Sequence, residues 1–483
     1  MSSTRELPCW HGEVPGSTTK REVIMWAAEF LAGACVAQLR TSNPAVAFTS
    51  VSIDTRTLQP GALYVALRGA NFDGHRFVDQ AIAQGATGVL VAGPVSAPDN
   101  VAVLQVRDTL LALQMMGQAA RRQFAGPVVA ITGSNGKTTT RQLTASVLRA
   151  HFGDDAVLCT EGNYNNHIGV PLTLLRLRQQ HRVAVIEMGM NHFDELTLLT
   201  SLAAPDIAVI TNAGPAHLEG VGSLAGVAQA KGEIFTGMRS GGTAVLNADD
   251  HFMPYWEVLN RNRRVVRFGM SDSADVYGTF SAAESRLNIA RGLDEAVTVK
   301  LPFAGEHNGR NALAAVAVAQ SLGISAAAVQ RGLESATNIG GRLTRRPISS
   351  QLCVIDDSYN ANPASIRAGL QVLLNEPGKR ILVLGDIAEL GQHSDSLHLS
   401  LLQDIERTSV DRVLTLGSRM QRAATAIGGR TSAYLDLDAM MQVLADEIAS
   451  AETGSVTVLA KGAHSMAMHR VVERLNAMYG EKQ

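Results

Sequence analysis

The sequence predicts an α/β protein of three domains: a small α/β N-terminal domain, a central parallel-sheet domain and a C-terminal Rossmann-like domain. A chain of 483 residues is longer than one hydrophobic core usually organises. Apolar runs such as Val183–Ile186 and Ile207–Ile210 are continuous rather than alternating, which is typical of strands buried on both faces of a parallel sheet. Turn residues and a helical stretch follow each run, so ligands are expected at the carboxyl ends of the strands.

Residues 1–107 are predicted to form the N-terminal domain, with roughly the first 18 residues as a loose tail. The capping-box pattern Thr19–Glu22 predicts a helix that carries Trp26, Phe30 and Leu31 inward. Short strands are expected at Val51–Arg56, Leu63–Leu67 and Gly88–Ala92.

Residues 108–339 are predicted to form the central domain and residues 340–483 the C-terminal domain. In the C-terminal part, apolar runs again alternate with helical stretches, at Cys353–Ile355, Ile381–Gly385, Val413–Gly417 and Val456–Ala460. This alternation favours a second doubly wound sheet.

The composition is that of an ordinary globular enzyme. Hydrophobic residues make up 46% and charged residues 18%, and the net charge of −2 argues against a nucleic-acid partner. The four cysteines form no C-x-x-C pair, which argues against a zinc site and a disulfide framework and favours the cytoplasm. The apolar run Met25–Ala37 is too short to span a bilayer, so no membrane insertion is expected.

The segment Thr132–Thr139 lies between an apolar strand and an amphipathic helix and reads T-G-S-N-G-K-T-T. Glycines let backbone N–H groups turn toward phosphate oxygens, Lys137 can reach the terminal phosphates, and the Thr138 hydroxyl can bind Mg²⁺. The segment therefore predicts a nucleoside triphosphate site in an ATPase-like central P-loop domain. Because position 131 is Ile rather than Gly, the loop is shorter than that of standard P-loop ATPases.

Three further polar residues follow the same sheet. Glu187 ends an apolar strand, where a carboxylate suits Mg²⁺, His217 follows the next strand, and Lys231 lies in a helical stretch. Taken singly, each has an ordinary structural explanation, as a turn cap, a packing residue and a solvated charge.

In combination with the short loop, these residues resemble the Mur ligases of bacterial peptidoglycan synthesis, from about residue 48 to the C-terminus. The resemblance is carried by Gly133–Thr139, Gly162–Gly169, Glu187–Gly189, His217–Glu219, Lys231–Glu233 and His307–Ala312, in the family's order and spacing. Within the family, Asp356–Pro363 resembles the MurF branch, which adds D-alanyl-D-alanine to UDP-N-acetylmuramoyl-tripeptide. Val383–Gly391 and Lys461–Met466 also resemble that branch, although Ala463-His464 replaces a common Ser-Arg pair.

The resemblance implies an ATP-dependent ligase that forms an acyl phosphate, which the amine of D-alanyl-D-alanine then attacks. Because a reactive acyl phosphate must be kept from water, we expect the C-terminal domain to close over the central one during turnover. We also expect a monomer. The implied catalytic residues are Lys137, Lys231, His217 and Arg342; the implied ATP-binding residues are Gly133, Ser134, Asn135, Gly136, Lys137, Thr138, Thr139, Asn308, Arg342 and Asp357. The resemblance implies two Mg²⁺ ions, with Thr138, Glu187, His217 and a carbamylated Lys231 as their ligands. The UDP-substrate is assigned to Ser52, Asp54, Arg56, Thr57, His75 and Asn163, and the dipeptide to Asn360 and Asn362.

Three alternatives stay open at this point. One is another ligase of the superfamily, such as the diaminopimelate-adding branch or folylpolyglutamate synthetase. Another is a P-loop ATPase or nucleotide switch that performs no ligation, and the third is a catalytically inactive binding protein. The third residue of the peptide substrate is not predicted.

Overall fold

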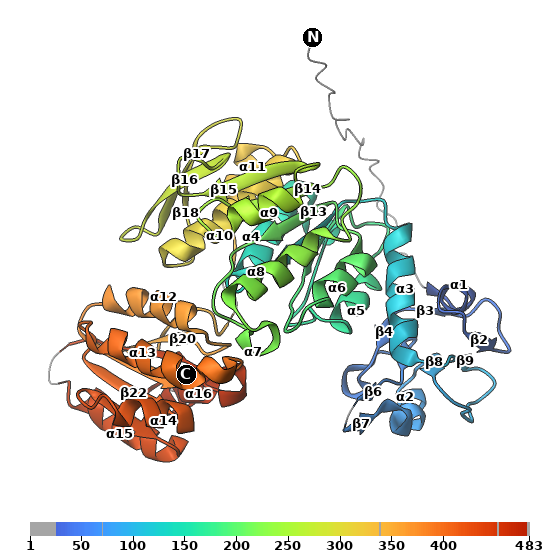
Figure 1. Cartoon of the computed structure of the whole chain (residues 1–483). Coiled ribbons are helices and arrows are strands. Elements are labelled where there is room, and N and C mark those ends of the chain that lie inside the picture. Colours follow the sequence, from blue (N-terminus) through green and yellow to red (C-terminus); the bar gives the residue numbers. More distant parts are fainter. Residues whose placement is uncertain (1–25, 70, 338–339, 452–453, 481–483) are drawn as a thin grey trace, which may run out of the picture.

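The computed structural model describes residues 26–69, 71–337, 340–451 and 454–480, which form three consecutive α/β parts (Figure 1). The expected helix start at residues 19–22 lies outside the described residues. Helix α1 (Ala28–Ala34) follows strand β1 (Trp26–Ala27), which pairs with β3 (Ala47–Phe48). The helix prediction was therefore wrong for Trp26, whose strand backbone is fixed by this pairing, but right for Phe30 and Leu31.

The N-terminal part contains a five-stranded sheet in the order β2-β9-β8-β5-β4. Its strands are Gln38–Arg40 (β2), Ala102–Gln105 (β9), Gly88–Val91 (β8), Leu63–Val65 (β5) and Val51–Ser52 (β4). A small hairpin of β6 (Arg68–Gly69) and β7 (Phe72–Asp73) precedes helix α2 (Val78–Ala83). The expected strand from residue 51 is shorter than predicted, because a 3-10 turn capped by Asp54 begins at Thr55.

The central part contains a nine-stranded sheet in the order β11-β12-β10-β13-β14-β15-β16-β17-β18. The strands are Val128–Thr132 (β10), Val157–Cys159 (β11), Val183–Glu187 (β12), Ile207–Ile210 (β13), Thr243–Asn247 (β14), Arg264–Gly269 (β15), Val276–Ser281 (β16), Arg286–Arg291 (β17) and Val297–Lys300 (β18). Strands β10 to β16 are parallel, which confirms the prediction made from the apolar runs of β10, β12, β13 and β14. Strands β11, β15 and β16 were not predicted from the sequence. Strands β17 and β18 extend the sheet antiparallel, an edge that the sequence analysis did not predict.

Strand β10 lies between β12 and β13, so the sheet has a topological switch point there. At this point the chain order reverses, and the loops leaving neighbouring strands diverge to opposite sides. The carboxyl ends of these three strands therefore enclose the crevice in which a ligand is expected.

Helices cover both faces of the central sheet (Figure 1). One face packs on α4 (Lys137–Phe152), α10 (Glu306–Ser321) and α11 (Ala326–Glu334), and the other on α5 (Gly169–Leu174), α6 (Glu195–Ala203), α8 (Leu224–Gly232) and α9 (Met253–Leu259). Helix α3 (Thr109–Gln123) packs against α1 on one side and α5 and α6 on the other, and so joins the N-terminal and central parts. A short helix, α7 (Leu218–Val221), lies next to the C-terminal part.

The C-terminal part contains a six-stranded sheet in the order β19-β20-β24-β21-β22-β23, parallel except for β19. Its strands are Thr344–Pro347 (β19), Leu352–Asp357 (β20), Lys379–Gly385 (β21), Arg412–Leu416 (β22), Thr431–Tyr434 (β23) and Val456–Lys461 (β24). The helices are Pro363–Leu374 (α12), Ser394–Glu406 (α13), Ser418–Thr425 (α14), Leu437–Ala449 (α15) and His469–Tyr479 (α16). This confirms the predicted doubly wound, Rossmann-like class.

Within the described part of the chain, none of the helices combines the length and apolar character needed to cross a membrane.

The loop Gly133–Thr139, between β10 and the first turn of α4, is called the phosphate loop below. The packing of α11 on α4 gives a test of the core that supports this loop. A Cβ atom on Gly332 of α11 would lie 2.4 Å from Cα of Val147 in α4, so Gly332→Ala must push the helices apart. We expect the variant to lose about 1–3 kcal/mol of central-domain stability, which calorimetry detects as a lower unfolding temperature. The control is Gly33→Ala in α1, where no heavy atom lies within 4 Å of the added Cβ. Equal unfolding temperatures for the two variants would contradict the close packing.

Candidate active site

The loop between β10 and α4 has a backbone that only glycine tolerates at two positions. Gly133 has φ +153° and Gly136 has φ +79°, and a Cβ atom on them would lie 1.8 Å from Oγ1 of Thr211 and 2.3 Å from Oδ1 of Asn311. Asn212, beyond β13, fixes the loop from the side: its Oδ1 accepts from N–H of Asn135 and its Nδ2 donates to the carbonyl of Asn135, each at 3.0 Å. These contacts fix the conformation of the loop.

Helix α4 begins directly at this loop and has no side-chain cap. Its first N–H groups and its partial positive charge therefore face the loop, as in anion sites at helix N-termini. Lys137 adds a cation: its Nζ donates to the carbonyl of Gly133 at 2.6 Å. Burial lowers the pKa of Lys137, while the nearby Glu187 carboxylate opposes that shift.

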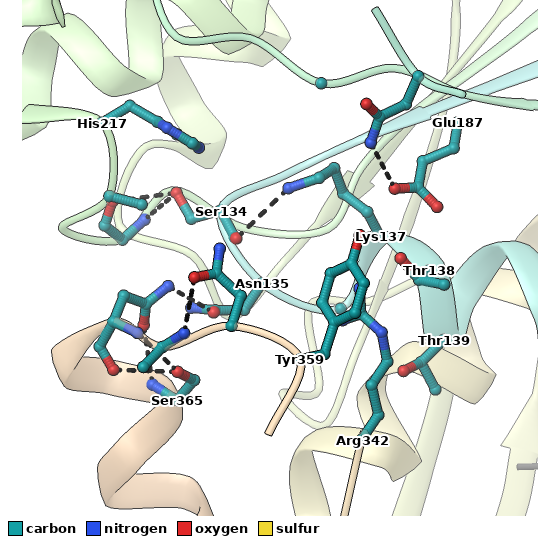
Figure 2. A pocket seen from close by; sticks show the side chains of 18 of the residues that line it. Ser134, Asn135, Lys137, Thr138, Thr139, Glu187, His217, Arg342, Tyr359 and Ser365 are labelled. Atoms are coloured by element: carbon teal, nitrogen blue, oxygen red, sulfur yellow. Dashed lines mark hydrogen bonds between the residues drawn. The ribbon is translucent and has the colours of Figure 1, made fainter. Parts of the chain in front are cut away.

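A cavity of about 760 Å³ opens over the loop. Its walls come from the phosphate loop, the loops after β12 and β13, the start of α10, and the C-terminal part. The predicted residues that line it are Ser134, Asn135, Gly136, Lys137, Thr138, Thr139, Asn163, Glu187, His217, Asn308, Arg342, Asp357, Asn360 and Asn362. Figure 2 shows Lys137, Glu187, His217 and Arg342 around this space.

Glu187 ends β12 and is 2% exposed. Its Oε1 accepts a hydrogen bond from Nδ2 of Asn165 at 2.9 Å. Its Oε2 is buried without a hydrogen-bond partner, and Nη1 of Arg141 lies 3.4 Å away. A buried carboxylate oxygen with free acceptor capacity in a cavity wall suits a cation or a hydrogen-bond donor of a ligand.

His217 precedes α7 and has a left-handed backbone, with φ +58°. Its Nδ1 lies 2.6 Å from Oε2 of Glu389, which belongs to the C-terminal part. The two atoms are in close contact, although their relative orientation is not that of a well-formed hydrogen bond. Burial lowers the pKa of His217, and the contact with the imidazole lowers the pKa of Glu389. Both shifts correspond to a neutral imidazole beside an ionised carboxylate.

Lys231, in α8, is 1% exposed and is not among the residues that line the cavity. Its Nζ lies 3.7 Å from Sδ of Met190, and Met190 does line the cavity. Burial, together with the charge of Lys137, lowers the pKa of Lys231 well below its usual value. Burial therefore disfavours the charged form of this amine, which lies beneath the cavity wall rather than in solvent.

The opposite wall carries Asn308, Arg342 and Asp357. Asn308 donates to the carbonyl of Ala304 at 2.7 Å. The guanidinium of Arg342 stacks on the ring of Tyr359 with its carbon 4.2 Å from the centroid, and its Nε is buried without a hydrogen-bond partner. The Asp357 carboxylate pairs with Nζ of Lys461 at 2.6 Å, while burial raises its pKa.

The two asparagines assigned to the dipeptide differ in their contacts. Asn362 caps α12 in a capping box, and its Nδ2 donates to Oδ1 of Asn135 in the phosphate loop at 2.7 Å. Asn362 therefore joins the C-terminal part directly to the phosphate loop. The Oδ1 of Asn360 accepts the backbone N–H groups of Ala361 and His464.

The residues assigned to the UDP end, apart from Asn163, lie in the N-terminal part away from this cavity: Ser52, Asp54, Arg56, Thr57 and His75. Asp54 holds the backbone N–H and the guanidinium of Arg56. His75 has both ring nitrogens engaged, Nδ1 with Asp73 at 2.6 Å and Nε2 with N–H of Ala92 at 2.9 Å. Its contacts hold the turn after β7 against β8.

The sequence analysis missed four residues of the site: Arg141, Asn165, Glu389 and Lys461. Asn165, Glu389 and Lys461 all lie inside segments that already resembled the family. Glu389 also follows β21 as His217 follows β13. No local signal distinguishes Arg141, because its ion pair with Glu187 joins residues far apart in the chain. Within the described part of the chain, no three His, Cys, Asp or Glu side chains form a group suited to a metal ion.

Three family models match most of the chain. The one described as Mur ligase family, catalytic domain matches residues 47–124. The Mur ligase middle domain matches residues 131–319, and the Mur ligase, glutamate ligase domain matches residues 341–464.

Individual relatives match over nearly the whole length. The UDP-N-acetylmuramoyl-tripeptide--D-alanyl-D-alanine ligase of Escherichia coli (strain K12) is 40% identical over 436 residues, which cover 89% of this chain and 94% of that relative. The crystal structure of MurF from Acinetobacter baumannii superposes with a TM-score of 0.87 at 34% identity, covering 94% of this chain and 99% of that one. MurF from Thermotoga maritima in complex with ADP gives a TM-score of 0.76 at 26% identity, covering 89% and 97%.

The glycine geometry of the phosphate loop gives a direct test of nucleotide binding. Gly136→Ala adds a Cβ atom at positive φ and against Asn311, so the loop must move. We expect its affinity for a fluorescent ATP analogue to fall at least about tenfold, or about 1.4 kcal/mol. Gly214→Ala is the control, since it lines the same cavity but its Cβ would meet no atom closer than 3.7 Å. Equal affinity in the two variants would contradict a phosphate site on this loop.

Proposed function

The chain belongs to the Mur ligase family, and on that premise we propose that it uses ATP to join D-alanyl-D-alanine to UDP-N-acetylmuramoyl-tripeptide. A relative named for this reaction is 40% identical over 89% of the chain. One observation carries the proposal in the structure: the phosphate loop and the Asp356–Pro363 segment face each other across one cavity. A phosphate donor and an incoming amine can therefore meet there.

ATP is proposed to bind on the phosphate loop, with its triphosphate at the start of α4. Gly133 to Thr139 supply N–H groups, Lys137 supplies a cation, and Arg342 faces the same space from the C-terminal part. Asn308 is assigned to adenine and Asp357 to the ribose or the phosphate shell. The unpartnered Nε of Arg342 supports its role, because a buried guanidinium nitrogen needs an acceptor.

The residues near the triphosphate fit Mg²⁺. Thr138 and Glu187 offer the hard oxygen ligands that Mg²⁺ prefers, and Oε2 of Glu187 has no hydrogen-bond partner. His217 is the third proposed ligand. When bound, the metal neutralises charge on the transferring phosphoryl group.

Lys231 is proposed to be carbamylated and, in that form, to be a ligand of a second Mg²⁺. The neutral amine attacks CO₂, a nitrogen–carbon bond forms, and the nitrogen loses a proton, which leaves a carbamate anion. This chemistry needs an amine that is uncharged near neutral pH, and burial of Lys231 lowers its pKa accordingly.

The reaction is proposed to proceed through an acyl phosphate. A carboxylate oxygen of the tripeptide attacks the γ-phosphorus, and the bond from that phosphorus to ADP breaks. The free amine of D-alanyl-D-alanine then attacks the acyl carbon, the amine loses a proton, and phosphate leaves with the former carboxylate oxygen. Lys137 and Arg342 stabilise the charge that develops on the phosphoryl oxygens.

The substrate is proposed to span the molecule. Its uridine diphosphate end binds near Ser52, Asp54, Arg56, Thr57 and His75, and its peptide end passes Asn163 to reach the cavity. Asn360 is the better supported dipeptide contact, because both polar atoms of the Asn362 amide are engaged, whereas only the oxygen of the Asn360 amide has a described hydrogen bond. We place the enzyme in the cytoplasm as a monomer, where both small-molecule substrates and ATP are available.

A panel assay tests this proposal. The purified protein, ATP, Mg²⁺ and UDP-N-acetylmuramoyl-tripeptide are incubated with D-alanyl-D-alanine, glutamate or diaminopimelate, and amide products are measured by mass spectrometry alongside ADP. We expect amide formation with D-alanyl-D-alanine. Turnover only with another amine, or ADP release without any amide, would reject the proposal.

Replacement of Lys231 tests the carbamate. Lys231→Ala removes the amine, and we expect kcat to fall by roughly 100-fold or more, as for loss of a metal-site group. With ¹³C-labelled bicarbonate, the wild-type protein should show a carbamate carbon signal that is absent from the variant. Lys300→Ala, which removes an exposed lysine from β18, is the control and should keep full activity. Wild-type turnover by Lys231→Ala would contradict the assignment.

A further inference from the structure

We infer that Glu389 is a positioning residue which, from the C-terminal part, sets the orientation and tautomer of His217 in the central part. The metal-binding nitrogen of His217 is then presented only when the two parts are docked. This inference rests on the proposed function, because it concerns the histidine assigned to Mg²⁺. It adds a residue from a different domain to that site.

The contact itself is short and crosses the domain junction. Oε2 of Glu389 lies 2.6 Å from Nδ1 of His217. The imidazole side chain is 17% exposed and the carboxylate is 47% exposed. Both residues line the cavity. The carboxylate therefore reaches into the cavity wall from outside the central part.

Both residues have a left-handed backbone, with φ +58° at His217 and φ +61° at Glu389. This conformation costs a non-glycine residue of order 1 kcal/mol or more and persists where surrounding contacts hold it. Residues with such a backbone cluster at functional sites, so their occurrence on both sides of this contact supports a functional role for it.

The segment that carries Glu389 is fixed within the C-terminal part. N–H of Ile387 donates to Nε2 of His398, which is fully buried, at 3.0 Å. The carboxylate of Asp386 accepts N–H of Met420 at 2.8 Å, and its carbonyl accepts N–H of Ala463 at 2.9 Å. Hydrogen bonds within the C-terminal part therefore hold the backbone that leads to Glu389.

The same segment, residues 386–391, contacts the central part beside His217. The carbonyl of Glu389 accepts N–H of Glu219 at 3.3 Å, and Gly391 approaches so closely that a Cβ atom would lie 3.1 Å from Cα of Glu219. Glu219 belongs to α7, which follows His217 directly. The backbone contact between Glu389 and Glu219 therefore lies immediately beside the side-chain contact between Glu389 and His217. The docking of the two parts and the His217–Glu389 contact therefore form together.

The chemistry of the pair explains what the contact does. A carboxylate beside Nδ1 favours the tautomer with hydrogen on Nδ1, which leaves the lone pair of Nε2 free for a metal. Outer carboxylates of this kind typically change metal affinity by 10–100-fold. Since this carboxylate comes from the other domain, the cation site is complete only in the docked arrangement. Phosphoryl transfer is thus favoured when the cavity is closed to water.

The test uses Glu389→Ala and Glu389→Gln, with Asp395→Asn as the control. Asp395 is an exposed carboxylate of α13 that pairs with Arg422 inside the C-terminal part. Mn²⁺ affinity is measured by electron paramagnetic resonance with a non-hydrolysable ATP analogue. The tautomer of His217 is read from ¹⁵N chemical shifts and assigned with a His217→Gln variant.

We expect Glu389→Ala to bind Mn²⁺ roughly 10–100-fold more weakly and to lose the Nδ1–H tautomer as the major form. Glu389→Gln should recover part of both, because its amide oxygen still accepts a hydrogen bond, and Asp395→Asn should match the wild type. Unchanged Mn²⁺ affinity and tautomer in Glu389→Ala would overturn the inference. The inference would also be overturned if Glu389→Ala were more open by solution scattering but kept wild-type Mn²⁺ affinity. Glu389 would then only hold the two parts together.

These readouts do not depend on amide formation. A wild-type protein that makes no amide but shows the Mn²⁺ and tautomer effects would refute the proposed function and keep the inference. A protein that makes the amide without those effects would support the proposed function and refute the inference about Glu389.

Discussion

The turn between β10 and α4 is the constraint on which the rest of the site depends. Its backbone passes so close to Thr211 and Asn311 that neither Gly133 nor Gly136 can carry a side chain. The turn therefore presents N–H groups and an uncapped helix N-terminus instead of side chains. Because β10 lies between β12 and β13, the same sheet edge delivers Glu187 and His217 to the space above the turn.

The second half of the site comes from the C-terminal part. The amide oxygen of Asn362 caps α12, and its amide nitrogen donates a hydrogen bond to Asn135 of the phosphate loop. One side chain therefore links the C-terminal part to the central part. Arg342, stacked on Tyr359, places a cation over the same space. A cavity divided between two domains suits a reactive acyl phosphate, because docking removes water and brings both reactants together.

The sequence predicted the features that short stretches of residues determine. It did not predict the features that depend on contacts between residues far apart in the chain. The phosphate loop, the parallel strands and Glu187 follow from short patterns, and the structure has each of them. Trp26 was assigned to a helix because its strand partner, Phe48, cannot be read from spacing. The antiparallel edge was missed although Arg286–Arg291 alternates between polar and apolar residues, and Glu389 was missed because only docking brings it to His217. The position of Lys231 beneath Met190 likewise follows from packing alone.

The most direct test of the central claim follows an oxygen atom. The tripeptide substrate is labelled with ¹⁸O in its reacting carboxylate, and the phosphate released with D-alanyl-D-alanine and ATP is analysed by mass spectrometry. If the carboxylate is activated on this phosphate loop as an acyl phosphate, one ¹⁸O atom is transferred to each phosphate formed. Phosphate that contains no label, with its oxygen derived from water, would contradict the account.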